Sequence, residues 1–306
     1  IHRRVFQGGF QMLGKLIKHD FRSLSRVLFP TQLAVLGASI IATIGFAFNI
    51  RTGFYTSYES GGLQLLRVIT AFLSGIMVLA IIAASILVAF IIFQRFYKNL
   101  MCDEGYLTFT LPVTTTQILW SKLITAMIWT FISGIVIFIS VNIFVLFGTG
   151  TSGIVNTEAY REMSKFIGEA FGLLGGRLIW PILEVILFMI VATACNILHV
   201  YLALIMGGVA SQKHKILAGI GFYFAINIAV TIVATTIQYF LSGAMFRTMD
   251  SFNGLPWDLK NSVEIYDLVF SSTQPYYWFY LLFSLAITAG FFILSRYFLK
   301  NKLNLE

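Results

Sequence analysis

The chain has 306 residues, of which 58% are hydrophobic and only 11% carry a charge. Soluble proteins have about a quarter of their residues charged, so this composition excludes an ordinary soluble enzyme or binding domain. Uncharged apolar runs recur that are longer than the roughly 20 residues needed to cross a bilayer. We therefore expect an all-α, polytopic membrane protein. Its two cysteines, Cys102 and Cys195, lie far apart and predict neither a metal site nor a disulfide framework.

The segment before the first apolar run, residues 1–26, predicts a helix that lies in the cytoplasmic membrane interface. Apolar residues recur there at three- and four-residue spacing, and basic residues occupy the opposite face. The apolar residues are Leu13, Leu16, Ile17, Phe21, Leu24 and Leu28, and the basic residues are Lys15, Lys18, His19, Arg22 and Arg26. Pro30 marks where this helix would bend into the membrane. Met12 is a candidate natural start, which would make residues 1–11 an addition.

The remainder, residues 27–306, predicts one transmembrane domain of six spans. An apolar window moved along the chain places these spans at residues 27–50, 68–93, 123–147, 178–208, 216–241 and 276–294. The second and fifth spans exceed the thickness of the hydrocarbon at about 1.5 Å per residue, so they should tilt or project into the aqueous layer.

Lysine and arginine set the expected orientation of the spans. With the N-terminus inside, 14 of the 21 basic residues fall on the cytoplasmic side. They are Arg3, Arg4, Lys15, Lys18, Arg22, Arg26, Arg95, Lys98, Lys122, Lys213, Lys215, Arg296, Lys300 and Lys302. The positive-inside rule then predicts that both termini are cytoplasmic. This topology, together with anionic lipid of the inner leaflet, explains the net charge of +8, so we expect no nucleic-acid partner.

Two longer segments, 148–177 and 242–275, are expected outside the cell. Residues 156–177 carry an apolar helical face, and residues 257–270 form a second, more acidic amphipathic segment. Such external helices could cover an exit site or serve only for packing, and both interpretations stay open.

Motifs for catalysis are missing from the sequence. It contains no G-x-x-x-x-G-K-[S/T] phosphate loop, and its four histidines are scattered, without the spacing of a metal site. We therefore expect no catalytic residue, no metal and no cofactor bound by this chain. If the protein performs work, its energy comes from another chain or from an ion gradient.

A few polar residues interrupt the fourth and fifth spans and are candidates for a transport path. They are Glu184, Asn196 and His199 in the fourth span, and Asn227 and Thr231 in the fifth, followed by Thr235 and Gln238. An ionisable residue at membrane depth is costly and usually faces protein or water. Glu184 follows Pro181 by about one turn, so a place near the outer headgroups is the alternative. Asn196 and His199 could instead form interhelical hydrogen bonds.

A polar loop, residues 94–122, joins the second and third spans on the expected cytoplasmic side. Asp103 and Glu104 stand at its apex, Gly105 interrupts a helix-compatible stretch, and Pro112 ends a short apolar run. Residues 114–116 are threonines that could cap a helix starting at Gln117 and continuing into the third span. The loop could be a docking element or simply a solvated turn.

The sequence of this loop resembles a known family. Residues 103–122, Asp-Glu-Gly-Tyr-Leu-Thr-Phe-Thr-Leu-Pro-Val-Thr-Thr-Thr-Gln-Ile-Leu-Trp-Ser-Lys, are similar to the first cytoplasmic loop of ABC-2 type ABC-transporter permeases. The opening of residues 12–21 also looks like the N-terminal interfacial helix of Firmicutes members, and six spans with both ends inside agree. The long external segment 148–177 departs from many simple members, which leaves open whether this is a plain exporter or a more specialised one.

The resemblance implies that the chain is one half of the membrane part of an exporter, in the cell membrane of a Gram-positive bacterium. Two permeases, identical or related, would pair with two cytosolic ATPase subunits that hold ATP and Mg²⁺. The loop would contain the coupling helix. Its docking contact would come from Asp103, Glu104, Gly105 and Tyr106, with Pro112 fixing the loop's shape.

Two other classes of function remain open from the residues. A gradient-driven carrier or channel would be favoured by an inverted repeat or several buried charges, and we find no repeat and only Glu184. A membrane scaffold or sensor would be favoured if the polar residues serve packing alone. For an exporter, apolar spans rich in aromatic residues, with 30 Phe in the chain, favour an amphipathic cargo such as a peptide, drug or lipid.

Overall fold

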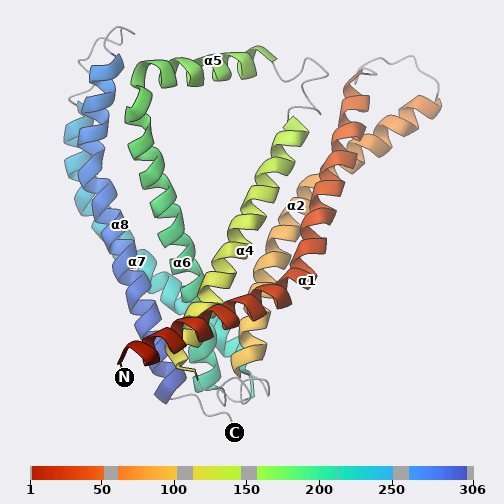
Figure 1. Ribbon diagram of the computed structural model, residues 1–306. Coiled ribbons are helices and arrows are strands. Elements are labelled where there is room, and N and C mark those ends of the chain that lie inside the picture. Colours follow the sequence, from red (N-terminus) through yellow and green to blue (C-terminus); the bar gives the residue numbers. More distant parts are fainter. Residues whose placement is uncertain are drawn as a thin grey trace. The chain divides into compact units, whose positions relative to one another are not determined.

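The computed structural model describes residues 2–51, 61–101, 113–145, 157–211, 213–250 and 262–301, and these are helical apart from short turns (Figure 1). The helices are α1 (His2–Arg51), α2 (Gly61–Met101), α4 (Thr115–Ile143), α5 (Thr157–Leu174), α6 (Ile179–Ala210), α7 (Lys215–Asp250) and α8 (Ser262–Asn301), with a 3₁₀ turn, η2 (Gly175–Leu178), before α6. The described part of the chain contains no strand.

Six of these helices are long and apolar enough to cross a membrane. The qualifying stretches are Met12–Ala47, Leu79–Met101, Thr115–Ile143, Ser164–Ala210, Lys215–Tyr239 and Val269–Asn301. Each contains or overlaps one of the six spans expected from the sequence. The prediction of an all-α polytopic protein is therefore confirmed.

The helix boundaries differ from the expected ones at two prolines. The expected interfacial helix and first span form one continuous helix, α1, with Pro30 inside it; in Figure 1 its ribbon changes direction as the colour passes from dark red to orange. Of the expected external segment 257–270, the described residues 262–270 form the first turns of α8, which continues through Pro275. Both prolines are accommodated inside long helices, as proline often is in membrane helices whose neighbours supply compensating contacts.

The chain divides into two compact units, which we describe separately. The first unit comprises residues 1–95 and 120–169. In it, α1 buries a stripe at three- and four-residue spacing that runs through Asp20, Leu24, Leu28, Gln32, Val35, Ser39 and Ala42. This stripe lies against α4. Phe21 stacks on Trp129 with ring centroids 5.1 Å apart, and the Gln32 amide donates to the Ser133 hydroxyl at 2.6 Å.

The second unit comprises residues 96–119 and 170–306, and α6 is its central helix. α6 packs against both α7 and α8. Its closest approach is to α7, where a Cβ added to Gly207 would lie 2.3 Å from the backbone nitrogen of Gly219. Such contact between two helix backbones is possible only without side chains, which is why small residues are typical of membrane helix interfaces.

Candidate functional site

The expected loop 94–122 is shorter in the structure, because residues 94–101 continue α2 and residues 115–122 begin α4. The segment between these two helices, called the loop from here on, is the strongest candidate site that the sequence offers. Its predicted coupling residues Asp103, Glu104, Gly105, Tyr106 and Pro112 lie outside the described residues. The two helix ends that flank the loop are described. The site can therefore be built from the way in which each end is held.

On the side where the chain leaves the loop, α4 begins with a capping box. The Thr114 hydroxyl accepts from the Gln117 backbone N–H at 3.3 Å, and the Gln117 side-chain oxygen accepts from the Thr114 N–H at 3.0 Å. This reciprocal pair satisfies two N–H groups that a helix start leaves free. The threonine cap is thus confirmed, although the helix starts at Thr115, slightly earlier than the expected Gln117.

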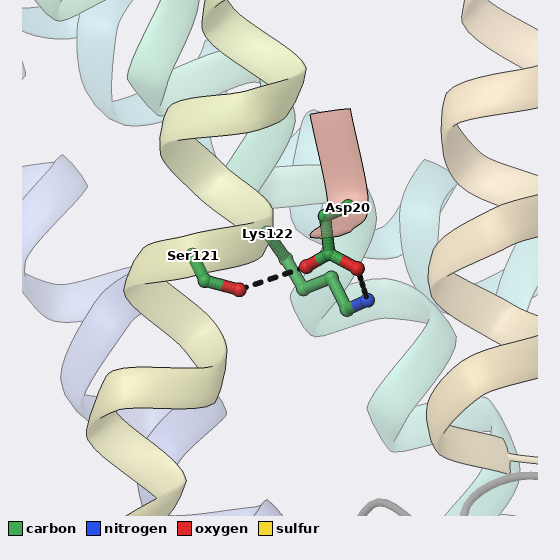
Figure 2. Close-up of polar contacts among 3 residues, drawn as sticks. All are labelled: Asp20, Ser121 and Lys122. Carbon is green, nitrogen blue, oxygen red and sulfur yellow. Dashed lines mark hydrogen bonds and ion pairs between the residues drawn. The ribbon is translucent and has the colours of Figure 1, made fainter. Parts of the chain in front are cut away.

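One turn further on, α4 is joined to α1 by a buried polar cluster, the Asp20 cluster, made of Asp20, Ser121 and Lys122 (Figure 2). The Lys122 ammonium lies 2.6 Å from one Asp20 carboxylate oxygen, and the Ser121 hydroxyl donates to the other at 2.8 Å. The side chains of Lys122 and Asp20 are only 9% and 7% exposed. A buried pair of this kind resists separation, because pulling the partners apart removes their mutual attraction while both charges stay out of water.

Reasoning from the sequence missed this cluster, although a signal was present. Asp20 lies in the apolar stripe of α1, four residues after Leu16 and four before Leu24. A carboxylate at an apolar position of an amphipathic helix indicates a buried partner of opposite charge. The partner itself, Lys122, is 102 residues away and could not be chosen from the pattern.

On the side where the chain enters the loop, the last turns of α2 are held by α6 and α7. Phe96 stacks on Tyr201 of α6, with centroids 3.6 Å apart and planes at 8°. The Lys215 ammonium donates to the backbone oxygen of Met101 at 3.2 Å. Phe96, Leu100 and Met101 are almost fully buried. The α2 end is therefore packed into the second unit up to the last described residue before the loop.

The candidate transport-path residue Glu184 is buried between α6 and α8. One carboxylate oxygen accepts from the Gln274 amide at 3.0 Å, and the Tyr277 hydroxyl donates to the Glu184 backbone oxygen at 2.6 Å. The Trp278 indole N–H in turn donates to the Gln274 side-chain oxygen. The other carboxylate oxygen is buried and has no hydrogen-bond partner among the described residues. The Glu184 side chain is thus enclosed by protein within this unit.

The other candidate path residues do not gather around Glu184. His199 is buried and stacked between Tyr223 and Phe291, at 4.6 and 5.4 Å. Asn196 is exposed and donates to the backbone of its own helix at Ala192, so its expected interhelical bond is not formed. Asn227 and Thr231 of α7 are exposed. Of the candidate path residues, Glu184 and His199 are therefore buried, whereas Asn196, Asn227 and Thr231 are exposed.

An exposed pair lies beside the Glu184 end of α6. Arg177 of the η2 turn is paired with Asp267 of α8 at 2.9 Å, and the Tyr266 hydroxyl donates to the Arg177 backbone oxygen at 3.0 Å. Partial burial raises the pKa of Tyr266, and the negative charges of Asp267 and Glu184 raise it further against the opposing charge of Arg177.

This raised pKa predicts a pH dependence. We expect Tyr266 to keep its proton past the ordinary tyrosine value of about 10. In the unfolded chain the phenol ionises first, so the contribution of Tyr266 to stability is complete below that value and is lost as the pH rises through the folded-state pKa. Ultraviolet difference spectra of tyrosinate between the wild type and Tyr266→Phe would measure the midpoint. A midpoint at or below the ordinary value would contradict this expectation.

No group of three or more His, Cys, Asp or Glu that could hold a metal is found among the described residues. The contacts described above attach both helices that flank the polar loop: the end of α2 to α6 and α7, and α4 to α1. Comparison with known proteins adds no assignment, because no family model, no curated protein and no solved structure matches this chain.

Proposed function

We propose that this chain is the transmembrane permease subunit of an ABC exporter. In this proposal two such permeases, identical or related, associate with two cytosolic ATPase subunits in a bacterial cell membrane. The partner ATPase binds ATP and Mg²⁺ and hydrolyses ATP, which agrees with the lack of a phosphate loop in this sequence. The cargo is an amphipathic molecule such as a peptide, drug or lipid.

The observation that carries the proposal is that tertiary contacts hold both helix ends that flank the loop. Before the loop, the Met101 backbone is bonded to Lys215 and Phe96 is stacked on Tyr201. After the loop, Lys122 and Ser121 are bonded to Asp20. A solvated turn requires no such anchoring.

Anchored ends allow force to pass from the loop to several helices. An α-helix transmits a displacement along its axis because each backbone bond ties one turn to the next. Displacement of the loop by a partner would move the α2 end together with α6 and α7, and the start of α4 together with α1. Close-packed contacts of this kind respond by switching between discrete arrangements and do not deform gradually.

The buried carboxylate of Glu184 fits a role along the cargo route. It lies in α6, the helix that also carries Tyr201, the stacking partner of Phe96 at the loop end. A displacement transmitted through Tyr201 would act on the helix that bears Glu184. Ionisable residues inside membrane spans commonly serve such paths.

Co-purification tests the proposal. We expect the wild type, expressed with its neighbouring genes and purified in mild detergent, to bring down a stoichiometric cytosolic ATPase with ATP turnover. Replacing Asp103, Glu104 and Tyr106 by Ala should abolish the association, because the docking side chains are lost.

The matched control replaces Glu162 and Glu169 by Ala, two exposed acids of α5, a helix that does not flank the loop in the sequence; this variant should retain the ATPase. A stable wild-type protein that purifies without an ATPase would contradict the proposal and favour a gradient-driven carrier or a scaffold.

A further inference from the structure

The turn that joins α6 to α7, residues 207–219 and here called the α6–α7 turn, is tightly built. The Ser211 N–H donates to the Gly207 oxygen at 3.1 Å, and the His214 N–H donates to the Ser211 hydroxyl at 3.1 Å. At its base the backbones of Gly207 and Gly219 are in direct contact. Because no room is left between the two helices at Gly207 and Gly219, we expect the ends of α6 and α7 to move together.

This turn also holds the end of α2. The Lys215 ammonium donates to the backbone oxygen of Met101, one of the last carbonyls of α2, which the helix itself leaves without a partner. A lysine at this point satisfies the carbonyl and places its positive charge at the negative end of the helix. The Met101 sulfur lies 3.0 Å from where a Cβ of Gly208 would be, so the side chain closes against the same turn.

We propose that Lys215 is a positioning residue that couples the loop to α6. The Lys215–Met101 bond makes the α2 end and the α6–α7 turn a single body, so that docking of the loop on the ATPase displaces α6. This inference rests on the proposed function and adds to it the route by which the signal reaches the helix that carries His199 and Glu184.

The chain offers a close control for Lys215. Lys213 belongs to the same turn and carries the same charge, yet it is exposed. Replacing Lys213 changes the net charge of the turn as replacing Lys215 does, and leaves the bond to Met101 in place. Lys215→Arg keeps a cationic donor and should rescue the coupling.

Hydrogen exchange of the purified permease–ATPase complex tests the inference, with a non-hydrolysable ATP analogue and Mg²⁺ as the probe. In the wild type we expect the nucleotide to change exchange both in the loop, residues 102–112, and in α6, residues 197–207. In Lys215→Met the loop should still respond, while the α6 response falls roughly two- to tenfold, as expected for loss of one hydrogen bond. Lys213→Met and Lys215→Arg should respond as the wild type does.

The outcomes separate the two proposals. If the ATPase is bound and α6 of Lys215→Met responds as in the wild type, the coupling role of Lys215 is overturned and the permease function stands. If the wild type binds no ATPase, both the permease function and the coupling role of Lys215 are contradicted. If Lys215→Met does not assemble, Lys215→Ala replaces it, because alanine has neither the charge nor a side-chain donor for the Met101 oxygen; an undiminished α6 response in that variant overturns the role equally. A purely structural role would alter exchange without nucleotide and leave the nucleotide response unchanged.

Discussion

Replacing Asp20 by Ala should lower the free energy of unfolding by about 3–5 kcal/mol, because the buried Lys122 ammonium then loses the carboxylate with which it is paired. Lys122→Met should have a similar effect, since it removes the positive charge that is paired with the buried Asp20 carboxylate. Thermal or denaturant unfolding of the purified protein in detergent would measure both.

The double variant Asp20→Leu, Lys122→Met distinguishes a charge effect from general damage to the α1–α4 contact. Buried ion pairs exchanged for apolar residues of similar volume are often neutral or more stable. We therefore expect the double variant to recover most of the loss seen in each single variant. Additive losses would mean that the Asp20 cluster contributes through packing and not through the pairing of charges.

Gly207→Ala should lower the free energy of unfolding by about 3 kcal/mol or more, the upper end of the range for overpacked cores. The new Cβ would lie 2.3 Å from the Gly219 nitrogen and 2.7 Å from the Lys215 oxygen, both backbone atoms that no rotamer change can move. α6 and α7 would have to separate at their closest point.

The matched control is Gly221→Ala on α7, where a Cβ meets nothing within 4 Å. There we expect a gain of about 0.5–1 kcal/mol, because alanine is the better helix former and no contact opposes it. The same unfolding measurement applies to both variants. Equal effects at the two positions would show that the Gly207–Gly219 approach is not a constraint on the fold.

Several features of the fold could be read from local sequence. The long uncharged runs predict membrane helices because the hydrocarbon admits only segments whose backbone groups bond internally. The threonine run before α4 predicts its cap, and the apolar stripe of residues 156–177 predicts helix α5, since both signals act within a few residues along the chain. Helix α8 extends beyond the expected span 276–294 at both ends, and Pro275 lies inside it because proline is tolerated in membrane helices.

The sequence by itself determined the class of the protein, the number of its spans and the polar loop between the second and third of them. These follow from hydrophobicity and from hydrogen bonds between near neighbours. Only the tertiary structure decided that Asp20 pairs with Lys122, that Lys215 holds the end of α2, and that Glu184 is enclosed while Asn227 is exposed. The physical reason is that an apolar helix presents residues in all directions. Which of its faces meets protein is settled by packing against helices far away in the chain.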